Sequence, residues 1–272
     1  MHWTPSLIAK LSQDVAIWIT VTKAQGSVPR GEGTVMAVFH DDFLGTIGGG
    51  HLEFEVIAEA RQILQSASIA QALPAEKRFA LGPSLRQCCG GALVVKFEKV
   101  DNTDLPQLLK RLEAQTSSRF QPLALFGGGH VGKALINVLA PLPFHVRWID
   151  SRDEIFPSDV APQVVCEHSN PVQAAVPDLA PNSRVLIMSF SHAEDLDIVA
   201  ACLKRLRVQK DLPYIGLIGS ATKWATFKRR LAERGFTEEE CKQITCPIGV
   251  SGIKGKEPEV IAVAVAAQLL QA

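Results

Sequence analysis

The feature that most constrains the fold is a strand–glycine–helix pattern near the middle of the chain. A short apolar stretch (residues 123–126) runs through Gly127-Gly-Gly-His-Val-Gly132 into an apolar-periodic segment (133–139). The three glycines at the first, third and sixth positions of the turn fit the G-x-G-x-x-G spacing of a dinucleotide site. In that motif they make the turn, admit a pyrophosphate and let helix and strand pack closely. The N–H groups at such a helix start favour an anion.

The residues that follow extend this unit into a parallel sheet. A second apolar strand, His145–Ile149, ends in Asp150, about 20 residues beyond the glycines, where the fold places an acid that accepts hydrogen bonds from a ribose. Strand patterns then recur at 163–166, 184–188 and 214–218, with a helix pattern at 196–206. Strands that alternate with helices predict an α/β fold, a Rossmann-like doubly wound parallel sheet that binds ligands at the carboxyl ends of its strands.

Three polar clusters fall at these predicted strand ends. They are Asp150–Arg152, Ser189–Asp195 and Gly219–Lys223. Within them, His192 is either a helix-cap residue or a ligand contact, and Ser220 either contacts a ligand or caps the next helix. A glycine-rich segment at 245–258 is either a surface linker or a loop that closes over a site between the domains.

The first part of the chain predicts a smaller α+β domain. Strand patterns at 14–22, 34–39, 43–47, 77–81 and 92–98 surround a helix pattern at 51–64. Gly48, Gly49 and Gly50 lead directly into that helix, so we expect a second set of bare N–H groups, with Glu53 in the first helical turn. The polar run 114–119 reads as the boundary between domains at 1–115 and 120–272.

Two adjacent cysteines stand out among six. Cys88 and Cys89 lie among glycines in the loop 82–91, where the backbone can approach a ligand closely. Neighbouring residues of an extended segment point in opposite directions, so both are rarely core residues. The pair predicts a functional thiol, either a soft ligand or a sulfur acceptor. Buried packing and a vicinal disulfide remain alternatives.

Charge and hydropathy exclude other classes of protein. Lys+Arg and Asp+Glu both number 28, so there is no electrostatic case for nucleic acid or an anionic membrane. No apolar run approaches the roughly 20 residues of a membrane span. The first residues show neither the basic flank nor the apolar core of a signal peptide, so we expect a cytoplasmic protein.

These segments together resemble the XdhC/CoxI family, the xanthine dehydrogenase accessory proteins. One departure is Phe190, where family members often carry histidine, which weakens any role for a histidine pair that includes His192. The resemblance rests on Gly26-Ser-Val-Pro-Arg-Gly31, Gly45-Thr-Ile-Gly-Gly-Gly-His-Leu-Glu-Phe-Glu55, Gln87-Cys-Cys-Gly-Gly91, Phe126-Gly-Gly-Gly-His-Val-Gly132, Asp150-Ser-Arg152, Gly216-Leu-Ile-Gly-Ser220, Cys246-Pro-Ile-Gly249 and Gly255-Lys-Glu-Pro258.

The resemblance implies a chaperone of the molybdenum cofactor in its molybdopterin form, within purine catabolism. Such a protein protects the cofactor, supports its sulfuration by a cysteine desulfurase and hands it to apo xanthine dehydrogenase, in contact with cofactor biosynthesis proteins. A homodimer is expected for the family. It remains open whether this chain carries out chemistry, and no catalytic residue is assigned. The expected cofactor-binding residues are Arg30, Gly48, Gly49, Gly50, Glu53, Gln87, Cys88, Cys89, Gly90, Gly127, Gly129, His130, Gly132, Asp150, His192 and Ser220, with Cys88 and Cys89 also the expected contact to molybdenum.

Two alternatives remain. An NAD(P)-binding oxidoreductase, or an accessory protein regulated by a nucleotide, would use the glycine turn and Asp150, but the sequence offers no defined proton donor for substrate chemistry. A scaffold that only docks partner proteins has no positive support in the sequence.

Overall fold

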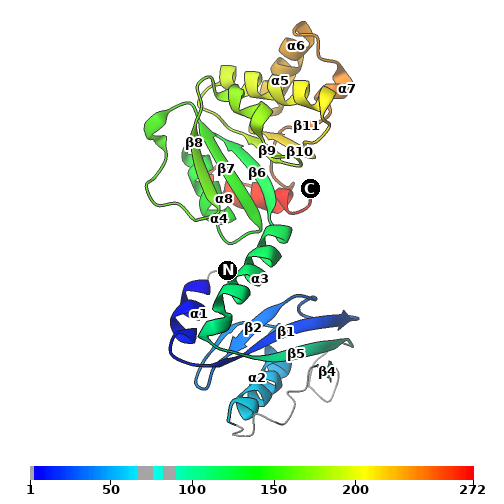
Figure 1. Cartoon of the computed structure of the whole chain (residues 1–272). Helices are drawn as coiled ribbons and strands as arrows, with labels where there is room; N and C mark the ends of the chain where they lie inside the picture. Colours follow the sequence, from blue (N-terminus) through cyan, green and yellow to red (C-terminus); the bar gives the residue numbers. More distant parts are fainter. Residues whose placement is uncertain (1–2, 66–75, 82–89) are drawn as a thin grey trace. The chain divides into compact units, whose positions relative to one another are not determined.

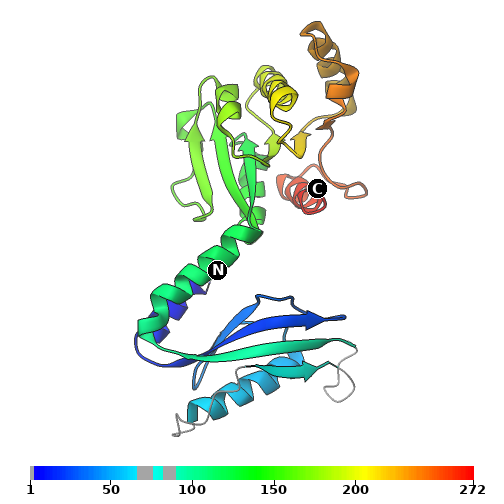
Figure 2. The same ribbon diagram turned by 45° about the vertical axis from the view of Figure 1, so that its right-hand side comes forward.

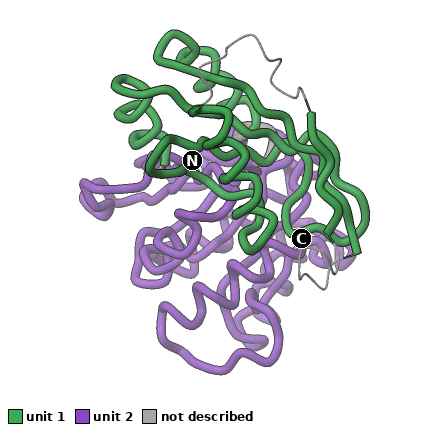
Figure 3. The backbone as a smooth tube through the Cα atoms, turned by 90° about the horizontal axis from the view of Figure 1, so that it is seen from below, with its two compact units in different colours: residues 1–118 green, residues 119–272 purple. Residues whose placement is uncertain are grey.

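The computed structural model describes residues 3–65, 76–81 and 90–272. The chain forms two compact units, Met1–Ser118 and Arg119–Ala272, shown in different colours in Figure 3. Each unit has its own hydrophobic core and is described by itself.

Unit 1 is an antiparallel sheet with helices on both faces (Figure 1). Its strand order is β3-β2-β1-β5-β4. The side chains of the central strand alternate, so Ile17, Ile19 and Val21 pack with helix α2 while Trp18 packs with α1 and α3 on the other face. The elements are α1 Thr4–Leu11, β1 Ala16–Gln25, β2 Val35–Val38, β3 Phe43–Gly45, α2 Gly50–Gln65, β4 Lys77–Ala80, β5 Ala92–Val100, η2 Asn102–Asp104 and α3 Leu105–Arg119.

Unit 2 is a six-stranded parallel sheet, and the predicted Rossmann-like fold is confirmed. Its strand order is β11-β10-β9-β6-β7-β8. Counted from the first strand of the unit, this is the order 3-2-1-4-5-6 of a doubly wound dinucleotide-binding sheet, with its switch point between β6 and β9. The strands are β6 Gln121–Phe126, β7 Phe144–Asp150, β8 Val164–His168, β9 Arg184–Ile187, β10 Tyr214–Leu217 and β11 Ile244–Thr245.

Helices cover both faces of this sheet (Figure 2). Helices α4 (His130–Leu139) and α8 (Pro258–Leu269) share one core with the strands, and α5 (His192–Val208) and η4 (Val172–Asp178) share the other. Because both faces are buried, the strands are apolar at successive positions; Val185, Leu186 and Ile187 of β9 are fully buried. The remaining elements are η3 Asp153–Ile155, α6 Ala221–Glu233 and α7 Glu238–Cys241.

The chain is helical at the predicted domain boundary. The polar run 114–119, which the sequence analysis interprets as the domain boundary, forms the last turns of α3; the two units divide inside this run, between Ser118 and Arg119. Helix α3 is anchored by Leu108 and Leu112, and no glycine or proline follows to end it before β6. Within the part of the chain that the structure describes, no helix is long and apolar enough to cross a membrane.

Candidate functional site

The glycine turn after β6 has the three properties that the motif predicts. Gly127 has a positive φ of +123°, and a Cβ there would lie 2.0 Å from the carbonyl oxygen of Met188 at the end of β9. A Cβ at Gly132 would lie 2.1 Å from the carbonyl oxygen of Gly127. A Cβ at Gly129 would meet nothing within 4 Å. The turn is therefore tightly packed at its ends and open at the residue that a phosphate would approach.

The start of α4 differs from those of two other helices at the same edge of the sheet. Its N-cap, Gly129, has no side chain to cap the helix, and His130 is an exposed first residue. Helices α5 and α6 are capped by Ser191 and Ser220, whose hydroxyl oxygens accept hydrogen bonds from backbone N–H groups at 3.2 Å. Ser220 is thus a cap residue. The cap of α5 is not His192, and a ligand contact by His192 stays a prediction.

Asp150 is held inside the turn. Its Oδ2 accepts hydrogen bonds from the N–H of Gly128 at 2.6 Å and from Nη2 of Arg152 at 2.8 Å. Its Oδ1 accepts from the backbone N–H and Nε of Arg152 at 3.0 and 2.8 Å. Burial raises the pKa of Asp150, but these hydrogen bonds and the charge of Arg152 outweigh it and hold the pKa below its ordinary value. Both oxygens are occupied, so a hydrogen bond from a ribose, which stays a prediction, would have to displace one of these donors.

The first turns of α5 and α6 carry a buried ion pair, Asp195–Lys223, to which the sequence assigns no role. Asp195 accepts hydrogen bonds from the backbone N–H and Oγ of Ser189 at 2.8 and 2.7 Å, and from Nζ of Lys223 at 2.6 Å. Lys223 also donates to the carbonyl oxygen of Ile218. The side chains of Asp195 and Lys223 are only 3% and 11% exposed. This pair connects the loop after β9 with the loop after β10. In the sequence, the only signal for Asp195 and Lys223 is that each follows a predicted strand.

An exposed aromatic side chain lies in the same group of loops. The guanidinium of Arg152 lies over the ring of Phe190, 4.6 Å from its centroid, and Phe190 is 66% exposed. His192 makes an edge contact with Phe227 at 6.3 Å between ring centroids. Cys246 follows β11, and burial raises the pKa of its thiol.

In unit 1, the expectation of bare N–H groups at the triple glycine is wrong. The Oε2 of Glu53 accepts hydrogen bonds from the N–H groups of Ile47 and Gly49 at 3.0 and 3.2 Å, and from Oγ1 of Thr46 at 2.5 Å. The N–H of Gly48 donates to Oγ1 of Thr46. A carboxylate four residues beyond Gly49 folds back onto the turn, so these donors are occupied and the local charge is negative.

The triple-glycine turn nevertheless lies against the loop 25–33. A Cβ at Gly48 would lie 2.4 Å from Cγ of Pro29. On the other side of this loop, a Cβ at Gly91 would lie 2.5 Å from the carbonyl oxygen of Ser27. Only glycine permits backbones to approach this closely. The structure thus brings together three segments, 25–33, 46–53 and 90–91, with the exposed Arg30 in the first of them.

The remaining predicted residues of this group lie outside the described residues. These are Gln87, Cys88 and Cys89, so their role stays a prediction, as does the meeting of both glycine turns in one cleft. Gly90 is described and exposed; Gly50 is exposed and begins α2 with a φ of +69°. Among the described residues, no group of three or more His, Cys, Asp or Glu side chains is placed to hold a metal ion.

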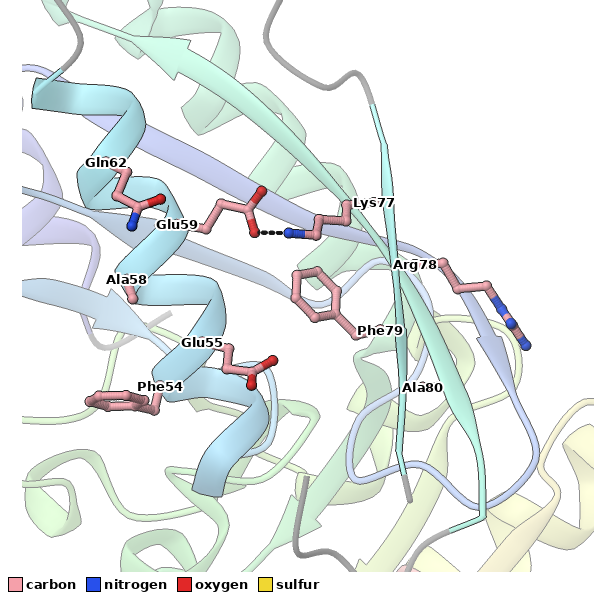
Figure 4. A pocket seen from close by; sticks show the side chains of 9 residues that line it. All are labelled: Phe54, Glu55, Ala58, Glu59, Gln62, Lys77, Arg78, Phe79 and Ala80. Carbon is pink, nitrogen blue, oxygen red and sulfur yellow. Dashed lines mark hydrogen bonds and ion pairs between the residues drawn. The ribbon is translucent and has the colours of Figure 1, made fainter. Parts of the chain in front are cut away.

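A groove of about 540 Å³ lies between α2 and β4 (Figure 4). Lys77 donates to Glu59 across the groove, and Glu55 pairs with His51, which precedes it on α2 and is not part of the lining. Phe54 on its rim is 68% exposed. The groove contains no predicted site residue, and nothing in its lining points to chemistry.

Comparisons with known proteins agree with this architecture. A relative in Escherichia coli K12, the uncharacterized protein YqeB, is 28% identical over 257 residues; the match covers 92% of this chain but only 42% of the relative's length. A crystal structure described as a xanthine dehydrogenase from Bacillus halodurans matches with a TM-score of 0.75 and 22% identity, over 98% of this chain and 95% of that chain. At that identity it shows a shared fold.

Family models identify both parts of the chain. The model of the XdhC Rossmann domain matches residues 123–269, and that of the XdhC and CoxI family matches residues 12–71. The first match contains the glycine turn and all strand-end clusters of unit 2. The second contains the loop 25–33 and the triple-glycine turn of unit 1. The resemblance found in the sequence is confirmed, and the chain belongs to the XdhC family.

Proposed function

We propose that the protein is an accessory factor in the maturation of xanthine dehydrogenase. In this role it binds the molybdenum cofactor, protects it, supports its sulfuration by a cysteine desulfurase and delivers it to the apo enzyme. Family membership supports the accessory role, and the relative from Bacillus halodurans is itself described as a xanthine dehydrogenase. The observation that carries the proposal is the convergence of three glycine-containing segments of unit 1 around Pro29 and Ser27.

The residues present suit such a cofactor. Its phosphate is an anion, and two places offer donors: the uncapped start of α4 at Gly129 and the exposed guanidinium of Arg30. Gly90 and Gly91 lead directly from Cys89 into the loop contact with Ser27, which places the two thiols next to this convergence in sequence. When bound, the molybdenum centre supplies the oxo–sulfido exchange, and the thiols would offer it soft ligands. The role of the chain itself is to bind the cofactor and to shield it.

Metal analysis of protein purified from a cofactor-producing cell tests this proposal. We expect molybdenum and the pterin in the wild type, and their loss in the Cys88→Ala, Cys89→Ala double variant. Cys166→Ala is the matched control, because Cys166 is a partly exposed thiol in the other unit, and it should retain the cofactor. Undiminished molybdenum in the double variant would remove the thiols from the site, and its absence from the wild type would refute cofactor binding.

A second candidate is a nucleotide-binding role for unit 2. Its strand order and the open Gly129 favour a dinucleotide, which would make this an NAD(P)-binding accessory protein or oxidoreductase. The two candidates are separable because molybdenum retention and nucleotide binding are measured independently.

A further inference from the structure

The carboxylates near the carboxyl ends of the unit 2 strands differ in the number of hydrogen bonds that they accept from described residues. Asp150 accepts four hydrogen bonds, two on each oxygen. Asp195 accepts three, from Ser189 and Lys223. Glu194 accepts one, at Oε1, from Oγ of Ser151 at 2.7 Å. Its other oxygen, Oε2, is buried and has no hydrogen-bond partner among the described residues.

The position of Glu194 relates it to the place where the fold holds a ribose. Ser151 follows Asp150 at the end of β7, so its hydrogen bond brings the Glu194 carboxylate from α5 to the strand end that carries the ribose acid in dinucleotide-binding sheets. Arg152 interacts with the charge of Glu194, but its Nε and Nη2 donate to Asp150. The end of β7 therefore has one carboxylate whose oxygens are both engaged, Asp150, and beside it a second carboxylate, Glu194, whose Oε2 has no donor among the described residues.

A buried acceptor without a donor is costly in the free protein, and such groups need an explanation. A Ser-x-x-Glu sequence at a helix start usually forms a capping box, in which the glutamate returns to the N-cap N–H. Here Ser191 caps the helix, but the side chain of Glu194 extends to Ser151 instead. The Glu194 carboxylate is therefore held at the end of β7 by Ser151 and does not bind the backbone N–H of its own N-cap residue, Ser191.

We propose that Glu194 is the ribose-binding residue of this site, and that its ligand is a dinucleotide with an unsubstituted ribose 2′-hydroxyl. In the complex the Glu194 side chain turns so that Oε2, which is buried in the free protein, accepts a hydrogen bond from the hydroxyl, while the pyrophosphate lies at the open start of α4 beside Gly129. The guanidinium of Arg152 donates to Asp150, so it does not bind a 2′-phosphate. The negative charge of Glu194 repels such a phosphate. This inference rests on the nucleotide-binding role proposed above for unit 2 and deepens it, and it does not depend on the molybdenum cofactor role.

Calorimetry with NADH and NADPH tests the inference, because these probes differ only at the 2′ position. We expect the wild type to bind NADH at least about tenfold more tightly than NADPH, the equivalent of one hydrogen bond to a charged group. Glu194→Gln should abolish this preference by weakening NADH about tenfold without weakening NADPH. Ser151→Ala, which removes the donor that positions the carboxylate, should reduce the preference partially.

The stability of the ligand-free protein provides a second readout. Since Oε2 has no donor in the free protein, Glu194→Gln should melt at or above the wild-type temperature, whereas loss of a purely structural carboxylate would lower it. Three results would overturn the inference: no heat with either nucleotide, a preference for NADPH, or a preference for NADH that survives in Glu194→Gln. None of them bears on molybdenum retention, so this inference and the proposed function fail separately.

Discussion

Replacing Asp150 with asparagine should destabilise unit 2 even when no ligand is present. The asparagine keeps one carbonyl oxygen but turns the other acceptor into an NH2 group, which faces either the Gly128 N–H or the Arg152 side chain. A buried N–H left without a partner costs about 1–3 kcal/mol. The Arg152 side chain is 35% exposed and regains water, so its lost bonds add at most about 1 kcal/mol.

We therefore expect a loss of about 3 kcal/mol in the free energy of unfolding. For a unit of this size, 1 kcal/mol shifts the melting temperature by about 2–4 °C, so the variant should melt about 6–12 °C below the wild type at pH 7. Thermal unfolding followed by circular dichroism measures this shift. Asp197→Asn is the matched control, because its ion pair with Arg234 is about 40% exposed on each side and should contribute less than about 1 kcal/mol.

The hydrogen bonds of Asp150 also determine how its contribution to stability depends on pH. The pKa of Asp150 is lowered in the folded protein, so its stabilising contribution is complete above the unfolded value of 3.8 and is lost as the pH falls through the folded value. The difference in stability between wild type and Asp150→Asn should thus be largest near neutral pH and shrink below about pH 3.8. A variant that melts within about 1 °C of the wild type at pH 7 would refute the structural role of Asp150.

Two further substitutions test the glycine turns. Gly132→Ala places a methyl group 2.1 Å from a backbone oxygen and should lower the free energy of unfolding, measured in urea, by about 2–3 kcal/mol. Gly129→Ala places its methyl group in open space and should cost less than about 1 kcal/mol, so equal losses would contradict the packing. Glu53→Ala removes the acceptor of three hydrogen bonds and should lower the free energy of unfolding by about 2 kcal/mol, measured by thermal melting. Glu55→Ala, at a side chain that is 42% exposed, should change it by no more than about 0.5 kcal/mol, and an equal effect of both would exclude the cap.

The sheet of unit 2 was predictable because a strand buried on both faces is apolar at every position, and such runs are visible in a sequence. The stretches at 123–126 and 184–188 both became central strands ending in polar loops. The roles of Gly127 and Gly132 were also predictable, because the spacing of these glycines follows from the backbone geometry of the turn.

The partners of the acidic side chains were not predictable. An acid in the first turn of a helix favours the dipole whether it faces solvent, caps the turn or crosses to another loop. Glu53 returns to its own turn, while Glu194 crosses to Ser151. Only the three-dimensional arrangement decides between these outcomes, which is why the triple glycine looked like an empty anion site and Glu194 passed unnoticed.

The continuation of α3 to Arg119 shows a similar limit. Polar residues such as those at 114–119 occur both in linkers and in solvated helical turns, and local composition does not separate the two. The helix persists because an anchored segment, with Leu108 and Leu112 in the core, propagates at little cost per added residue.

The strand lengths described above bear on how the protein behaves at high concentration. In unit 1 the central strands have ten and nine residues, but the outer strands β3 and β4 have three and four, and β11 of unit 2 has two. Unpaired backbone at the border of a sheet is a template for adding strands from other molecules. Borders this short offer few such positions, so we expect little tendency toward intermolecular sheet growth and aggregation along these three strands.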